Sequence, residues 1–145
     1  MFRKFRLHAV LIVACAIIIV FPMLREKPAP EKAEVATRVA NDFFALIDVD
    51  RFEASWDSGS SLLQQKTSRK DWVKNLTTIR KQFGPLIDRA QAKSRYTTSA
   101  KDSPDGEYII LDYASQFKNH PDAKESIIVT FEKDNVWRVA GYHLQ

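Results

Sequence analysis

The side chains best suited to acid–base chemistry are two aspartates, Asp48 and Asp112, and the tyrosine that follows the second, Tyr113. A carboxylate can act as a general base, and a phenol can donate a proton or a hydrogen bond. Alternation along an extended strand, however, places Asp112 and Tyr113 on opposite faces. Because the sequence pairs no acid with a base, an enzyme is the weakest of the functions that we consider.

Other residues that could carry catalysis or bind a metal are few. Ser60 lies in "DSGSS", which lacks the flanking glycines of a nucleophile elbow, so we expect a loop or helix-capping serine. His120 and His143 have no carboxylates at a metal-ligand spacing, and the single cysteine, Cys15, precedes the domain. We therefore predict no catalytic residue, no metal site and no cofactor.

The elements that would position any site begin with helices. Apolar residues at helical spacing predict a first helix over residues 33–48. Two short helical turns should follow, with Asp50 and Ser58 as caps. Ser68 begins a pattern that resembles a capping box, which predicts a further helix over residues 69–83.

After Pro85 the period changes to the two-residue alternation of strands. Four strands are predicted as an antiparallel meander, over residues 86–100, 108–117, 126–132 and 136–142. Helices that precede strands along the chain indicate an α+β fold. The predicted architecture is an N-terminal transmembrane helix, then about three helices packed on one face of a curved four-stranded antiparallel sheet.

One face of this sheet should lie against the helices, and the other should be open. Alternation turns Ile109, Leu111 and Val129 inward, and the three tryptophans are expected to fill the core. The open face would then be more apolar than a free surface needs to be, which indicates association. The candidate interaction surface consists of Tyr108, Ile110, Ile128, Arg138 and Tyr142.

Three cations alternate along the first predicted strand. Arg89, Lys93 and Arg95 share one side of it, so a contact with an anion such as phosphate or a lipid headgroup is one interpretation. Charged side chains on an edge strand also prevent edge-to-edge pairing, and this is the simpler interpretation.

The N-terminal residues have the pattern of a membrane anchor. Residues 1–6 form a basic flank with three cations, and residues 7–24 carry no formal charge. As a helix this run would be about 27 Å long, close to the thickness of the hydrocarbon core. The positive-inside rule places the flank in the cytoplasm. Residues 25–32, with two prolines, are then a tether, and residues 33–145 an extracytoplasmic domain.

Two alternatives stay open for this segment. Cleavage of a signal peptide needs a small-x-small site, and the match at Ala14 and Ala16 lies within the apolar run. Cys15 ends "LIVAC", which resembles a lipoprotein box, so lipidation of this cysteine is the other alternative. The apolar run continues well past both positions, and this favours an uncleaved signal anchor.

The net charge of +4 does not indicate a nucleic-acid-binding protein. Residues 1–27 hold five Lys and Arg against one Glu, whereas residues 28–145 hold 17 basic and 17 acidic residues. The basic excess therefore belongs to the anchor. Within the domain, residues 66–101 carry a net +8 between two segments of net −4. Such blocks attract an anionic partner or complement one another within the fold, and we expect the second.

Several motifs in one order carry a family resemblance: "ANDFFALIDVDRFEASWD", "DWVKNLTTIRKQFGPLIDR", "YTTSAKDSPDGEY" and "VWRVAGY". Over roughly residues 34–144 the chain resembles the bacterial family called domain of unknown function 4019. The resemblance implies a small exported protein with a cone-like α+β fold, similar to nuclear-transport-factor-2-like or cystatin-like domains. It implies no activity and no site residues.

Three functions follow in order of preference. The first is a single-pass bacterial inner-membrane protein whose periplasmic domain binds a protein partner, or a second copy, through the open sheet face. The second is binding of a small apolar ligand or lipid in a pocket between helices and sheet. The third is an uncharacterised enzyme.

Overall fold

The computed structural model describes residues 27–145. The predicted basic flank, the predicted anchor and residues 25 and 26 of the predicted tether lie outside these residues. Within residues 27–145, no helix has both the length and the apolar character needed to cross a bilayer.

Helices precede the strands, as predicted. Within residues 27–145 they number four, against about three predicted: α2 (Pro30–Ile47), α3 (Phe52–Asp57), α4 (Ser61–Lys66) and α5 (Arg69–Phe83). Helix α2 begins at Pro30, three residues before the predicted start, so the helix includes the end of the predicted tether. Proline suits this position because its fixed φ is helical and its missing N–H would have no partner in the first turn.

Serine side chains cap two of these helices. Ser68 Oγ accepts a hydrogen bond from the backbone N–H of Asp71 at 3.1 Å, as the capping-box pattern predicts. Ser60 Oγ accepts one from the N–H of Leu63, so Ser60 is the N-cap of α4. Of the two other predicted caps, Asp50 is wrong, whereas Ser58 does cap a helix, at the C-terminal end of α3. Asp50 has a positive φ of 60° in the turn before α3.

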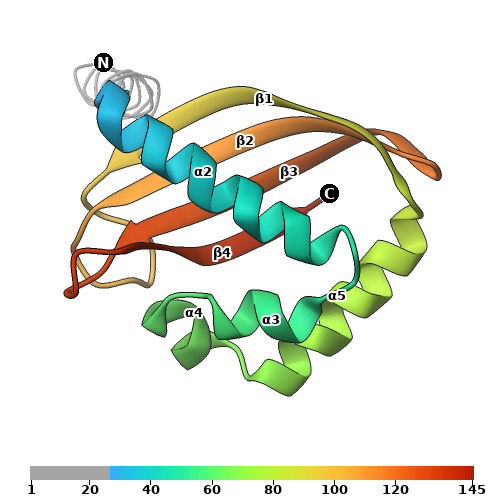
Figure 1. The fold of residues 1–145 in the computed structure, drawn as a ribbon, viewed down its shortest axis with the longest axis horizontal. Coiled ribbons are helices and arrows are strands. Elements are labelled where there is room, and N and C mark those ends of the chain that lie inside the picture. The colour runs from blue at the N-terminus through green and yellow to red at the C-terminus, as the bar shows by residue number, and fades with distance from the viewer. Residues whose placement is uncertain (1–26) are drawn as a thin grey trace, which may run out of the picture.

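The sheet is a four-stranded antiparallel meander in the order β1-β2-β3-β4, which confirms the predicted topology (Figure 1). Its strands are β1 (Leu86–Thr97), β2 (Tyr108–Phe117), β3 (His120–Phe131) and β4 (Trp137–Leu144). Strand β3 begins six residues before its predicted start. The turn between β2 and β3 is only two residues long, so that Phe117 pairs with His120.

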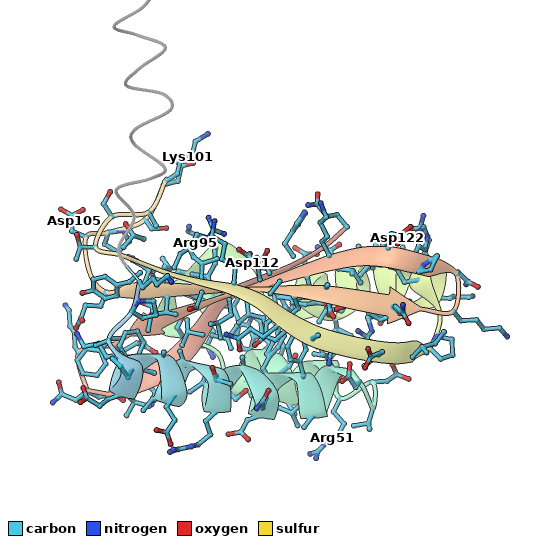
Figure 2. All side chains as sticks on the ribbon, turned by 90° about the horizontal axis from the view of Figure 1, so that it is seen from above. Arg51, Arg95, Lys101, Asp105, Asp112 and Asp122 are labelled. Atoms are coloured by element: carbon cyan, nitrogen blue, oxygen red, sulfur yellow. The ribbon has the colours of Figure 1, made fainter. Side chains whose placement is uncertain are left out.

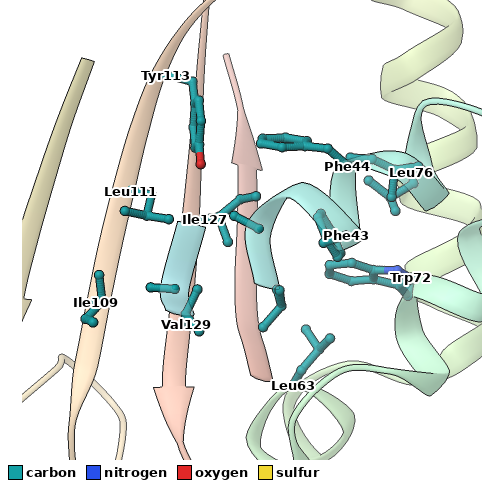
Figure 3. Close-up of a cluster of buried hydrophobic side chains, with 14 of the residues drawn as sticks. Phe43, Phe44, Leu63, Trp72, Leu76, Ile109, Leu111, Tyr113, Ile127 and Val129 are labelled. Carbon is teal, nitrogen blue, oxygen red and sulfur yellow. The ribbon is translucent and has the colours of Figure 1, made fainter. Parts of the chain in front are cut away.

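The core lies between the sheet and the helices, which cover one face of it (Figures 1 and 3). Ile109, Leu111, Tyr113, Ile127 and Val129 are buried on the inner face, as alternation predicts. They pack against residues of the helices, among them Phe43, Phe44, Leu63, Trp72 and Leu76.

Extra residues in β1 and β4 interrupt the alternation. Gln91 pairs with Tyr113 and Lys93 with Asp112, so Ala92 has no partner in β2. Gly141 pairs with Ile128 and Val139 with Val129, so Ala140 has no partner in β3. Each bulge moves the side chains that follow it to the other face. These two bulges decide which candidate residues face the core.

Candidate functional site

A cluster of charged side chains extends from an open groove into the apolar core and is centred on Glu125 of β3. This carboxylate has no solvent exposure. It accepts hydrogen bonds from Arg89 Nε at 2.7 Å, from Ser115 Oγ at 2.6 Å and from the hydroxyl of Tyr142 at 2.5 Å. Arg80 Nη1 lies 3.9 Å from its Oε2 atom. We call Asp48, Arg80, Arg89 and Glu125, with Ser115 and Tyr142, the buried ion cluster.

Asp48 is the second carboxylate of the cluster. It accepts hydrogen bonds from Arg80 Nη2 at 2.8 Å and from Arg89 Nη1 and Nη2 at 2.8 and 3.0 Å. Arg89 therefore bridges both carboxylates, and its guanidinium lies 3.5 Å from the centre of the Phe44 ring. Two cations and two anions balance, so the cluster carries no net charge.

Each member is positioned by a different element. Asp48 is the C-cap residue of α2, and Arg80 lies in the last turn of α5. Arg89 lies on β1 before the Ala92 bulge and pairs with Ser115 of β2, which places its side chain on the inner face. Glu125 pairs with Tyr113 on one side and Leu144 on the other. The cluster thus connects two helices to all four strands.

The environment shifts the proton affinities of the cluster. Burial lowers the pKa of Arg89, but the hydrogen bonds and charges of Asp48 and Glu125 outweigh it, so its pKa is raised overall. Burial and the negative charge of Glu125 raise the pKa of Tyr142 well above that of a free phenol. Burial also raises the pKa of the neighbouring Tyr113 to about 12. Both phenols therefore stay protonated at neutral pH.

This arrangement is suited to holding elements together. Hydrogen bonds or ion pairs within the protein engage both carboxylates, so neither is free to accept a proton from a substrate. The hydroxyl of Tyr113 has no partner within residues 27–145, but it is buried. An open groove of about 880 Å³ lies beside the cluster, lined by Asp48 and Arg80 and by the exposed Glu53 and Lys81.

The three cations predicted to share one side of β1 are divided by the Ala92 bulge. Arg89 faces inward and belongs to the buried ion cluster, so the prediction that it shares a surface with the other two is wrong. Lys93 is exposed. Arg95 lies on the open face and donates to Asp112 at 2.8 Å (Figure 2).

The predicted interaction surface is only partly exposed on the open face. Ile110 and Ile128 pair with each other there and are partly exposed, as is Arg138. Tyr108 lies on this face but is buried, because the loop of residues 98–107 folds over it. Its hydroxyl donates a hydrogen bond to the carbonyl oxygen of Pro104 at 2.5 Å.

The predicted outward position of Tyr142 is wrong. The Ala140 bulge turns its side chain inward, opposite Ile127, and its ring centre lies 5.4 Å from that of Phe43 and 6.3 Å from that of Phe44. Asp112 lies on the open face, opposite to that of Tyr113, as alternation predicts. Its carboxylate accepts hydrogen bonds from Ser126 and Arg95.

Sequence reasoning missed Arg80 and Glu125. Glu125 is in phase with Ile127 and Val129, so a charged residue on the buried side of β3 was the available signal. The predicted start of this strand at residue 126 excluded it. Arg80 carries no such signal, because basic residues are common in the last turn of a helix.

The fold and the cluster define a class of protein: a small α+β domain with helices on one face of a four-stranded antiparallel sheet, compatible with a nuclear-transport-factor-2-like cone fold. Within that class the chain belongs to the family described as "Protein of unknown function (DUF4019)", which matches residues 39–142. This confirms the resemblance that the motifs carry.

The chain is also similar in fold to a solved structure at low sequence identity. The structure of Aln2 from a Streptomyces species superposes with a TM-score of 0.52 at 10% identity, over 83% of this chain and 93% of that one. A structure from Catenulispora acidiphila gives a TM-score of 0.48 at 10% identity, over 79% and 91% of the two chains. No curated protein matches the sequence.

Proposed function

We propose that this protein is a membrane-anchored assembly module of the bacterial periplasm, which associates with a second copy of itself through the open face of its sheet. The observation that carries the proposal is the pair Ile110 and Ile128, which lie side by side on β2 and β3 and stay partly exposed. Burial of partly exposed aliphatic side chains against another surface removes apolar area from water, which favours association.

The charges around this pair favour a second copy as the occupant. Arg95 is paired with Asp112 at 2.8 Å, and Arg138 with Glu132 at 3.1 Å and Asp134 at 2.8 Å. The two arginines beside the apolar pair are thus paired with anions, whereas the exposed Lys93 and Lys124 of this face have no ion pair within residues 27–145. Two such faces can meet at the apolar pair without repulsion between these arginines, as a two-fold symmetric interface requires.

Anchoring supports the same proposal. The uncharged run of residues 7–24, with the basic flank before it, has the sequence pattern of a signal anchor. Two copies held in one membrane meet at a high effective concentration, so a small contact area is enough for association.

The other two functions have less support. Aromatic packing fills much of the space between the helices and the sheet: Phe44 lies 4.9 Å from Tyr113, and Phe43 lies 5.4 Å from Tyr142, between ring centres. This disfavours an apolar ligand there. The buried Glu125 and the partly exposed Asp48 are both engaged by arginines within the protein, which disfavours acid–base catalysis.

The test is native mass spectrometry of the full-length chain, gently extracted from its own membrane. We expect a homodimer that Ile128→Glu converts to a monomer. Val49→Glu, the same kind of change at an exposed valine beyond the end of α2, should leave the dimer intact. A monomeric wild-type chain, or a dimer that survives Ile128→Glu, would contradict the proposal. Co-purification of a different protein in place of the second copy would also contradict it.

A further inference from the structure

One end of the domain combines the start of α2 with partly exposed aromatic side chains. Lys32, in the first turn of α2, forms an ion pair with Glu107, which precedes β2. The carbonyl oxygen of Glu107 accepts from the N–H of Phe131 at 3.1 Å. Ser61 of α4 donates to Glu132 at 2.8 Å. We call this end, with the loop of residues 98–107 and the turn of residues 132–136, the tether end (Figures 1 and 2).

The tether end carries an apolar group of residues on and beside the β3–β4 turn. Phe131 and Trp137 pair across the two strands, with ring centres 5.1 Å apart, and both are partly exposed. Val136 is 43% exposed between them. Leu62 of α4 is also partly exposed and lines the same shallow groove as Phe131, with a volume of about 450 Å³.

Trp137 differs from the other two tryptophans. The indole N–H of Trp56 donates to the carbonyl oxygen of Thr67 at 2.9 Å, and that of Trp72 donates to Ser55 at 3.0 Å. No acceptor for the indole N–H of Trp137 is found within residues 27–145. A tryptophan with an apolar ring and an unused N–H is typical of the boundary between water and hydrocarbon.

From this combination we infer that the tether end rests on the membrane surface, with Phe131, Val136 and Trp137 in the headgroup region. The inference rests on the anchoring in the proposed function. Five residues, 25–29, separate the predicted anchor from Pro30, and they can span at most about 18 Å. The start of α2 is therefore held within that distance of the bilayer, and the β3–β4 turn lies at the same end.

The contact is apolar rather than electrostatic. Glu107, Glu132 and Asp134 are each paired with a cation of the same end. Lys101 and Lys133 have no ion-pair partner within residues 27–145, and neither have Asp102 and Asp105. Glu132 and Asp134 share the single cation Arg138, so the tether end has no excess of positive charge that would attract anionic lipid. The surface should therefore bind zwitterionic lipid, and added salt should not release it.

This orientation also decides where the open sheet face, the proposed dimer interface, lies relative to the membrane. If the tether end faces the bilayer, the strands run away from the membrane and the open sheet face points sideways, toward a neighbouring copy anchored in the same membrane. The groove beside the buried ion cluster then lies at the far end, away from the lipid.

The test uses the full-length chain in phosphatidylcholine vesicles whose acyl chains carry bromine, a short-range quencher of fluorescence. An environment-sensitive fluorescent amino acid replaces Val136 in one sample and Val49 in the other. Val49 follows α2, which is 18 residues and therefore about 27 Å long, so it lies at the opposite end. We expect a loss of fluorescence at position 136, none at position 49, and no change with salt.

The outcomes separate this inference from the proposed function. A chain that leaves the vesicles contradicts the anchoring on which both rest. A chain that stays, with no quenching at position 136 or with equal quenching at both positions, overturns the membrane contact and leaves the anchor intact. Dimerisation is measured independently, through Ile128→Glu. Circular dichroism of both labelled chains confirms that the fold is unchanged.

Discussion

Arg89 donates two hydrogen bonds to Glu125, at 2.7 and 3.2 Å, from a strand 36 residues earlier in the chain. The carboxylate is fully buried, and the guanidinium covers the ring of Phe44. A buried charge is tolerated only when a partner compensates for its lost hydration. The pair therefore ties β1 to β3 through the core and makes each residue depend on the other.

Replacement of Arg89 should destabilise the fold strongly. We expect Arg89→Met to lower the free energy of unfolding by about 3 to 5 kcal/mol, because Glu125 and Asp48 would be left without their shared cation. Arg95→Met is the matched control, since Arg95 lies on the same strand in a partly exposed pair, and should cost about 1 kcal/mol or less. Urea titrations of the three proteins measure both values, and equal costs would contradict the central role of Arg89.

Substitutions at Tyr142 distinguish an inner from an outer position. Tyr142→Phe keeps the ring contacts with Phe43 and Phe44 and removes the hydrogen bond to Glu125, which should cost about 1.5 to 3 kcal/mol. Tyr142→Glu would place a second carboxylate beside Glu125 and should prevent folding. If thermal denaturation showed the glutamate variant to be as stable as the wild type, Tyr142 would face outward after all.

Alkaline pH should destabilise the protein through its buried phenols. The pKa of Tyr113 is raised from 10.0 to about 12, and that of Tyr142 is raised further. Above pH 10 the unfolded chain loses these protons while the folded chain keeps them, so stability falls as the pH rises. The expected slope is at most about 1.4 kcal/mol per pH unit for each phenol, and below pH 10 they contribute none.

Unfolding free energies measured on both sides of pH 10 check this dependence. The variant with Tyr113→Phe and Tyr142→Phe should show a flatter decline. If the decline were as steep as in the wild type, it would come from other groups.

The end of α5 requires glycine. Gly84 has a φ of +78°, and a Cβ atom there would lie 3.0 Å from Nδ2 of Asn119. We expect Gly84→Ala to cost about 1 to 2 kcal/mol. Gly106→Ala is the control, because the nearest atom to its new Cβ would be 3.8 Å away, and it should change the stability by less than about 0.5 kcal/mol. Chemical denaturation compares the two, and similar values would argue against strain at Gly84.

Much of the fold could be predicted from local patterns. The capping box at Ser68 predicts the start of α5, and the glycine after Phe83 predicts its end. Both ends agree with the structure. Alternation correctly turned Ile109, Leu111 and Phe117 toward the core. These signals succeed because helix caps and strand periodicity depend on residues close together in the chain.

The candidate site was harder to predict. Arg89 and Tyr142 were predicted on the wrong face of the sheet. Each lies on a strand with a bulge, and no residue type at the bulge predicts it. Ala92 and Ala140 are ordinary strand residues in the sequence. Only the register with the neighbouring strand shows that they are extra.

The sequence by itself determined the order of helices and strands, the meander and most of the inner face, because each depends on periodicities and caps within a few residues. Only the tertiary structure decided which charges meet. Asp48, Arg80, Arg89 and Glu125 come from four elements, and their attraction acts through space at distances of 2.7 to 3.9 Å. Spacing along the chain does not predict this meeting, because it depends on the pairing register of β1 and on the packing of two helices.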